Sequence, residues 1–257
     1  MMIRAVFFDI DGTLIPIGGT RMPPETIDTL KKLRQKGCKI FIATGRNVRE
    51  LGIITNDFAF DGYITLNGQI CFDEHFRMLY GNPIHPEDME VLKMVYETKE
   101  VPVAMIGQNR SYINYIDSRV HRIHQDINIA LPEIDDYDEE TIYQLNIYAD
   151  QNYAEKLFQH LPHSRMSRWH PYGIDIFSDT GGKAAGIQRI LQHFGISQKE
   201  TMAFGDGDND IEMLQYVELG VAMGSADFQV KSAADHVTDD AEKRGIQKAV
   251  EYFGTAL

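Results

Sequence analysis

Two aspartates stand one residue apart directly after the first apolar run of the chain. The run ends at Phe8 and is followed by Asp9, Ile10, Asp11 and Gly12. Alternate residues of a strand point the same way, so Asp9 and Asp11 can face one small volume. There one carboxylate could attack a phosphorus atom and the other could move a proton. A polar turn after a strand is the alternative, because Asp-Gly is a common turn pair.

A second candidate follows another apolar run and reads Ala43-Thr44-Gly45-Arg46. A hydroxyl group, an unhindered backbone N–H and the N-terminus of a following helix would suit a phosphate oxygen. Taken alone, this segment is equally typical of a helix whose cap is Thr44, and that simpler interpretation is favoured.

A third candidate is Gly182-Lys183 at the start of a predicted helix. It is not a P-loop, because Phe177 stands where that motif has its first glycine and Ala184 where it has Ser or Thr. A lysine at a helix start is unfavourable for the helix dipole, which suggests another task such as neutralising a phosphate. A solvated lysine is the alternative.

The fourth candidate is the acidic segment Gly205-Asp206-Gly207-Asp208-Asn209-Asp210. Dense carboxylates suggest a hard cation with oxygen ligands. A calcium loop of the EF-hand type is excluded, since Ile211 stands where it needs glycine and Val217 where it needs glutamate. Magnesium fits, because it needs one or two carboxylates with water and phosphate. The alternative is a helix with an acidic first turn.

The elements that must position these candidates alternate between buried strands and helices. Strands are predicted at residues 4–8, 39–43, 63–66, 201–204 and 219–223, and helices at 24–36, 183–194 and 210–216. A turn at Asn67-Gly68 would lead into a further strand at 69–72. This alternation predicts a doubly wound, Rossmann-like α/β core with a parallel sheet covered on both faces. Three candidates end strands at the edge where such sheets bind ligands.

The middle of the chain has a different pattern. Half-buried strands are predicted near residues 103–106, 111–116, 142–148, 165–169 and 174–177, with helices near 86–99 and 151–160. We therefore expect an α+β domain at 83–180, inserted into a core made of residues 1–82 and 181–257.

In this order and on these elements, the four motifs resemble the haloacid dehalogenase-like superfamily. The insert between the second and third motifs, the short segment after Asp11 and the later Gly220-Val221-Ala222-Met223-Gly224 resemble its Cof-type branch with a type IIB cap. The resemblance covers essentially the whole chain. It implies a phosphatase with a catalytic core and a substrate-selecting cap.

The resemblance also implies a role for each matching position. Asp9 would be the nucleophile that forms an aspartyl-phosphate, and Asp11 the general acid and base. Magnesium would be held by Asp9, the carbonyl of Asp11, and Asp206, with Asp210 in support. The backbone of Ile10, and Thr44, Gly45, Lys183 and Asn209, would hold the phosphate. A cation, a lysine and N–H groups suit the charge that develops in phosphoryl transfer.

The insert contains weaker candidates. Trp169, Tyr172 and Asp175 could contact the substrate or could pack within the insert. His121 and His124 lie three apart on a predicted helix, a spacing that could serve a metal. No carboxylate motif surrounds them, so ordinary surface or hydrogen-bonded histidines are the favoured interpretation.

The leading function is hydrolysis of a small phosphomonoester, with a sugar phosphate as the substrate that the resemblance suggests. Phosphorylated cofactors remain alternatives. A phosphomutase of the phosphomannomutase type and a catalytically silent module that binds phosphorylated metabolites are the rival hypotheses.

Charge and composition restrict the partners. The net charge of −13 argues against nucleic acid or an anionic membrane surface as a general partner. No apolar run approaches the roughly 20 residues that a membrane helix needs. The two cysteines, Cys38 and Cys71, have no metal-ligand spacing and are expected as reduced thiols. We expect a cytoplasmic monomer or weak homo-oligomer that acts on small phosphorylated metabolites.

Overall fold

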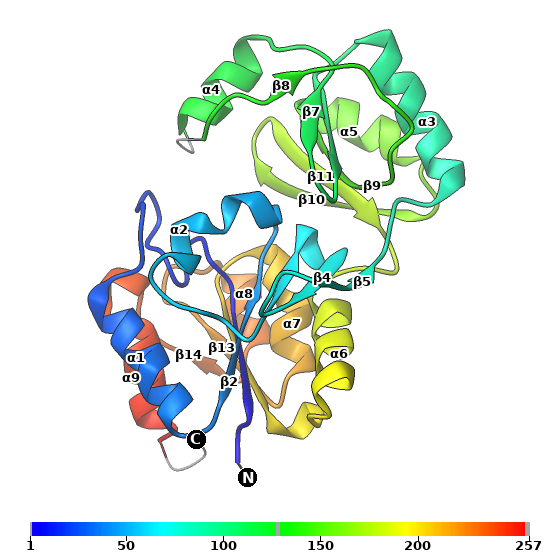
Figure 1. The fold of residues 1–257 in the computed structure, drawn as a ribbon. Coiled ribbons are helices and arrows are strands. Elements are labelled where there is room, and N and C mark those ends of the chain that lie inside the picture. The colour runs from blue at the N-terminus through cyan, green and yellow to red at the C-terminus, as the bar shows by residue number, and fades with distance from the viewer. Residues whose placement is uncertain (1, 127–128, 255–257) are drawn as a thin grey trace. The chain divides into compact units, whose positions relative to one another are not determined.

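The computed structural model describes residues 2–126 and 129–254, and these form two compact units. The core unit comprises the chain up to Tyr80 and again from Gly182, and the inserted unit comprises Gly81–Gly181. The chain therefore leaves the core unit once and returns to it once (Figure 1). No helix in the described ranges has both the length and the apolar character that crossing a membrane requires.

A twisted eight-stranded sheet forms the centre of the described core unit. In spatial order its strands are β14 His236–Val237, β13 Leu219–Ala222, β12 Thr201–Gly205, β1 Ala5–Phe8, β2 Lys39–Ala43, β3 Gly62–Thr65, β4 Ile70–Asp73 and β5 Met78–Gly81. From β14 to β3 neighbouring strands are parallel, and β4 pairs antiparallel with β3. The strand order grows outward from β1 in both directions. This is the predicted doubly wound core, with its topological switch point between β1 and β12.

Helices cover both faces of this sheet. They are α1 Pro24–Gln35, α2 Gly52–Thr55, α6 Lys183–Phe194, α7 Ile211–Tyr216, α8 Phe228–Ala233 and α9 Gly245–Tyr252. Single 3-10 turns lie at η1 Val48–Glu50, η2 Leu66–Gly68, η3 Gln198–Glu200, η4 Asp208–Asp210 and η5 Ala241–Lys243. Helices α1 and α9 lie side by side on one face, while α6 and α7 lie on the other (Figure 1).

Local sequence explains where the principal helices begin and end. Pro24 occupies the first turn of α1, where its missing N–H has no helical partner to lose. Gly195 ends α6 in the left-handed conformation, with φ +62°. A residue in this conformation donates its N–H to one of the last helical carbonyls, here that of Leu191. Glycine adopts the conformation without steric penalty. The strands of the parallel sheet are apolar on both sides because helices bury both faces.

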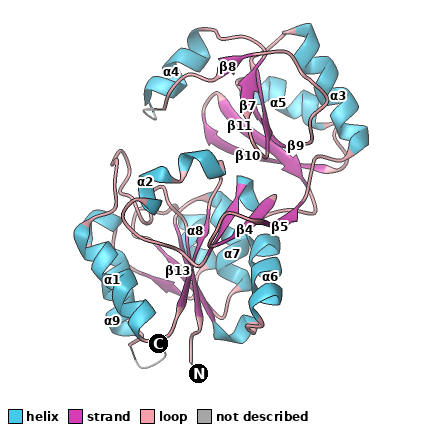
Figure 2. Ribbon diagram, in the orientation of Figure 1, coloured by secondary structure: helices cyan, strands magenta, loops and turns pink. Residues whose placement is uncertain are grey.

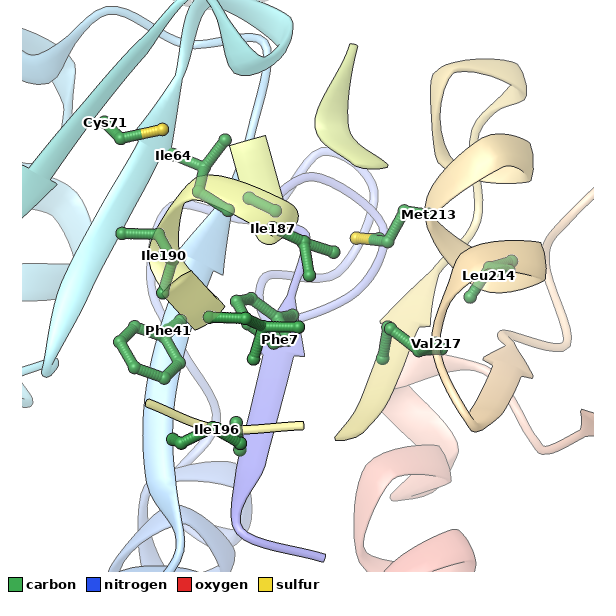
Figure 3. Packing of buried hydrophobic residues seen from close by; sticks show 14 of the residues in the cluster. Phe7, Phe41, Ile64, Cys71, Ile187, Ile190, Ile196, Met213, Leu214 and Val217 are labelled. Carbon is green, nitrogen blue, oxygen red and sulfur yellow. The ribbon is translucent and has the colours of Figure 1, made fainter. Parts of the chain in front are cut away.

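The face under α6 and α7 shows how these elements are held together. Phe7 of β1 stacks on Phe41 of β2, with ring centroids 5.0 Å apart. Ile187 and Ile190 of α6 and Met213 of α7 pack against these strands in one buried cluster (Figure 3). Burial of each such side chain contributes roughly 1.5–3 kcal/mol. This packing fixes the helix that begins with Lys183 against the strands that end near Asp9 and Asp206.

The inserted unit is an α+β domain with its own sheet and core (Figure 2). Its strands run in the spatial order β10 Ser164–His170, β11 Gly173–Ser178, β9 Ile142–Ile147, β6 Val103–Gly107, β7 Ser111–Ile113 and β8 Glu133–Ile134. Its helices are α3 Pro86–Thr98, α4 Ser118–Asp126 and α5 Gln151–Phe158. The strands pair antiparallel, except that β7 and β8 are parallel. Alternate residues of β11, Ile174 and Ile176, enter the apolar core, which places Asp175 on the opposite face.

Candidate active site

The three central strands of the core sheet end beside one another and carry the predicted residues. Asp9 follows β1, Thr44 follows β2 and Asp206 follows β12. Because β12, β1 and β2 are parallel neighbours, their carboxyl ends meet at one edge. Lys183 opens α6, which packs over the same strands. Topology alone therefore brings together segments more than 190 residues apart in the chain.

Lys183 is the centre of a buried charge cluster. Its Nζ donates to Asp9 Oδ1 at 2.7 Å and to Asp210 Oδ1 at 2.6 Å. Lys183, Asp9 and Asp210 are 1%, 6% and 0% exposed. Burial alone would lower the pKa of Lys183, but Asp210 and Asp9 outweigh it and hold that pKa above its ordinary value. The lysine is therefore permanently charged, and it fixes the orientation of the Asp9 carboxylate.

Asp210 organises the loop that carries Asp206. Its Oδ2 accepts hydrogen bonds from the backbone N–H groups of Asp206 and Gly207, both at 3.0 Å. Thr13 Oγ1 donates to Asp206 Oδ1 at 3.1 Å, which ties this loop to the segment after β1. Gly12 makes the approach possible: its φ is +81°, and a Cβ there would overlap Asp206 Oδ2.

The carboxylates of Asp9, Asp206 and Asp210 each place an oxygen within 4.8 Å of the others. Burial, together with the neighbouring carboxylates and against the attraction of Lys183, raises the pKa of Asp9 well above its ordinary value. Burial, and then the charge of Asp210, raise the pKa of Asp206 to about 6. Like charges held this close disfavour ionisation unless a cation joins them. The donor set, oxygen atoms from acidic side chains, fits a hard divalent ion such as Mg²⁺.

Asp11 lies apart from this buried cluster. Its side chain is 58% exposed and forms a bidentate pair with Arg46, whose Nε and Nη2 donate to the two carboxylate oxygens at 2.7 Å each. This hydrogen bond, opposed by burial, raises the pKa of Arg46. The two residues come from the ends of β1 and β2, so the pair spans neighbouring strands.

The segment after β2 differs from one sequence-based expectation. No helix begins at Thr44: the next turn is η1, and its cap is Asn47, whose side chain accepts from Arg49 N. Thr44 Oγ1 instead accepts from Arg46 N at 3.1 Å and so closes a local turn. The predictions of a helix cap at Thr44 and of a helix N-terminus directly after it, suited to a phosphate oxygen, are therefore both wrong.

Asn67 connects two of the predicted phosphate-binding segments. Its Oδ1 accepts from Asn209 Nδ2 at 2.9 Å, and it lies 3.2 Å from where a Cβ on Gly45 would stand. Asn67 is buried and adopts φ +53°, a conformation that Asn tolerates better than most residues. Gly45 and Asn209 therefore both lie beside the amide group of Asn67.

Comparison with known proteins identifies the family. A family profile described as haloacid dehalogenase-like hydrolase matches residues 6–250. The chain belongs to this family. The Bacillus subtilis (strain 168) protein named "Putative phosphatase YkrA" is 33% identical over 256 residues, which cover 98% of each chain. The predicted membership of the superfamily's Cof-type branch is confirmed.

Solved structures agree with the family assignment. A superfamily phosphatase from Bacteroides thetaiotaomicron has a TM-score of 0.91 and 31% identity, covering 98% of this chain and 96% of that one. A subclass IIB sugar phosphatase has a TM-score of 0.89 and 34% identity, covering 98% of this chain and 99% of that one. The predicted fold class and the predicted enzyme class, a phosphatase, are confirmed.

In this haloacid dehalogenase-like hydrolase the weaker candidates lie in the inserted unit. Asp175 Oδ1 accepts from Trp169 Nε1 at 2.7 Å and from Asn146 Nδ2 at 3.1 Å, while Trp169 and Tyr172 are partly exposed. Asp175 therefore already orients Trp169 within the unit. His124 contacts the carbonyl of Ala130 and the hydroxyl of Tyr148, as expected for a hydrogen-bonded histidine.

Three residues near the acidic cluster received no individual role from sequence reasoning. Thr13 and Arg46 stand inside the motifs, but their contacts cross between strands. Asn67 stood in a segment predicted as a hairpin turn, and it does connect β3 with β4. Its side-chain contact with Asn209, 142 positions away, has no local sequence signal.

Proposed function

We propose that this protein hydrolyses a small phosphomonoester, with a sugar phosphate as substrate, in a magnesium-dependent reaction through an aspartyl-phosphate. The observation that carries the proposal is the buried cluster of Asp9, Lys183 and Asp210 at the carboxyl ends of β1 and β12. Open α/β folds bind ligands at the carboxyl ends of their strands, and this cluster lies there with a further carboxylate, Asp206, beside it.

Asp9 is proposed as the nucleophile. A carboxylate oxygen of Asp9 forms a bond to phosphorus as the bond from phosphorus to the leaving oxygen breaks. Lys183 holds Asp9 Oδ1 and restricts rotation of the carboxylate, so that little orientational freedom is lost during attack. The ammonium group also stabilises negative charge that accumulates on the phosphoryl oxygens.

Magnesium is proposed to be held by Asp9, the carbonyl of Asp11, and Asp206, with Asp210 in support. The three side chains that the structure groups as potential ligands belong to this set. When bound, Mg²⁺ supplies positive charge opposite the transferring phosphoryl group. Lys183 and the loop amides hold Asp210 in place, so its role is to position this ligand loop.

Asp11 is proposed as the general acid and base. It protonates the leaving oxygen in the first step and removes a proton from the hydrolytic water in the second. Both of its oxygens accept from Arg46 in this structure. Proton transfer therefore requires that the pair open, and Arg46 is the residue that determines how readily Asp11 becomes available.

Phosphate oxygens are proposed to be held by the backbone of Ile10 and by Thr44, Gly45, Lys183 and Asn209. The inserted unit is proposed as a cap that selects the substrate, with Trp169, Tyr172 and Asp175 as its contacts. The polar face that carries Asp175 and Asn146 suits hydroxyl groups. Similarity to a solved sugar phosphatase supports this substrate class. We expect the enzyme to act in the cytoplasm.

The test is inorganic phosphate release from a panel of phosphorylated sugars, cofactors and nucleotides, with magnesium and with chelator. We expect metal-dependent turnover of sugar phosphates that Asp9→Asn abolishes. Release from cofactors alone would refute the sugar assignment. No release from a folded, magnesium-loaded protein, with phosphoryl transfer between sugar positions instead, would replace hydrolysis by a mutase reaction.

A further inference from the structure

A second group of metal-binding side chains lies in the inserted unit. Among the described residues, His85, Glu87 and His163 each offer a donor atom within 4.8 Å of the other two. His85 directly precedes α3, Glu87 lies in the first turn of that helix, and His163 directly precedes β10. The group thus joins two segments that are 76 positions apart in the chain.

We infer that His85, Glu87 and His163 form a binding site for a divalent transition metal, with Zn²⁺ as the favoured ion. Two imidazoles and a carboxylate are a donor set that zinc uses with a fourth position open to water. Magnesium prefers oxygen ligands in an octahedral arrangement, so it competes poorly for this set. The inference is independent of the proposed reaction, since it uses none of the residues of the acidic centre.

One pair of donors is already spaced as in a tetrahedral site. Glu87 Oε2 and His163 Nε2 lie 3.2 Å apart. Two ligands at about 2.0–2.1 Å from a tetrahedral zinc ion are separated by roughly 3.3 Å. The rings of His85 and His163 are tilted by 40°, with centroids 3.9 Å apart. Ligation of one ion by both imidazoles therefore requires the two rings to rotate away from each other.

A buried carboxylate holds His163 in position. Asp88, which is fully buried, accepts from His163 N at 3.1 Å and from Ser164 Oγ at 2.5 Å. Asp88 is the neighbour of Glu87 on α3, so these bonds fix the β10 segment against the helix that carries Glu87 and is capped by His85. Such outer contacts preorganise ligands and strengthen metal binding.

Metal binding at His85 competes with one existing contact. The Nδ1 of His85 accepts from Glu87 N at 3.3 Å and so caps α3. A ring that accepts at Nδ1 carries its proton at Nε2, so ligation requires either Nδ1 itself or the other tautomer. Either route gives up a single long hydrogen bond. The other two donors give up the contact between Glu87 and His163.

The site opens onto a hollow of about 290 Å³, lined by residues 82–86, His163 and residues 178–180. These two ranges are the segments by which the chain enters and leaves the inserted unit. A metal with three protein ligands would therefore present its open position to a space that can hold water or a small anion. It would also clamp α3 to β10 beside both connecting segments.

The experiment is zinc titration of the full chain by calorimetry, in excess magnesium and in the background of Asp206→Asn, which disables the acidic centre. His163→Ala removes one donor, and His85→Asn removes another while keeping a good helix cap. His160→Ala, which removes an exposed histidine outside the group, is the matched control. Circular dichroism and metal-free melting establish that each variant is folded.

We expect one zinc ion per chain in the Asp206→Asn background, with affinity lowered at least about tenfold by either test substitution and unchanged in the control. Cobalt should give the visible spectrum of a four-coordinate site, absent from His163→Ala. Zinc affinity that is unchanged in both test variants would overturn the inference. Zinc binding to the wild type that the Asp206→Asn background lacks would overturn it too. If His163→Ala fails to fold, His85→Asn decides the result.

Discussion

In the absence of metal, the ionised carboxylate of Asp206 should destabilise the core unit, with the full effect above about pH 6. The substitution Asp206→Asn tests this. Burial and the charge of Asp210 raise the pKa of Asp206 from 3.8 to about 6. A shift of about two units corresponds to roughly 3 kcal/mol. Below pH 4 both the folded and unfolded states hold the proton, and there is no penalty. Between about pH 4 and 6 the unfolded state releases a proton that the folded state keeps, so stability falls as pH rises.

Asparagine has nearly the same shape but cannot ionise, and its amide oxygen can still accept from Thr13. In chelator at about pH 7.5, Asp206→Asn should therefore raise the free energy of unfolding by up to about 3 kcal/mol. For a unit of this size the melting temperature should rise by roughly 2–4 °C per kcal/mol. At about pH 4 the variant and the wild type should melt together.

The assay is thermal and urea unfolding in chelator at both pH values. Asp208→Asn is the matched control, because it removes the same charge from an exposed side chain of the same loop. Magnesium should stabilise the wild type at about pH 7.5 and the Asp206 variant much less. A variant no more stable than the wild type at that pH, or an equal gain in Asp208→Asn, would refute the reasoning.

Three further substitutions separate the roles of the site. Asp9→Asn should lower phosphate release by roughly four or more orders of magnitude in steady-state assays, while the melting temperature does not fall; retained turnover would exclude Asp9 as nucleophile. Lys183→Met leaves two buried carboxylates without their partner and should destabilise the fold by about 3–5 kcal/mol, measured by urea unfolding. Arg46→Ala should raise kcat, because Asp11 then has no guanidinium partner to leave before it transfers a proton. Its effect on the free energy of unfolding should stay below about 1 kcal/mol, since the pair is partly exposed, and an unchanged kcat would remove Arg46 from the reaction.

Sequence reasoning recovers the parts of the fold that local chemistry determines. The apolar run before Asp9 forms β1, and the helix predicted at 183–194 is α6, ended by Gly195 as expected. In the inserted unit, the helix predicted from Pro86 is α3. These elements depend on hydrophobic periodicity and on boundary residues, both of which can be read along the chain.

The contacts across the site could not be predicted in the same way. The pairing of Arg46 with Asp11 depends on the register of β1 and β2, and the contact of Asn67 with Asn209 depends on where a distant loop packs. The prediction of a helix at Thr44 failed because a hydroxyl that can cap a helix can equally close a turn. Tertiary structure decides between these two uses.

The charges of the acidic centre determine what the proposed phosphate site requires. Asp9, Asp206 and Asp210 with Lys183 have a formal charge of −2 when all four are ionised. This charge repels a phosphate dianion, and the lysine alone cannot reverse it. A divalent cation would neutralise it and leave Lys183 and the strand-end amides to attract the substrate. Metal binding should therefore precede substrate binding, and chelation should abolish phosphate binding as well as turnover.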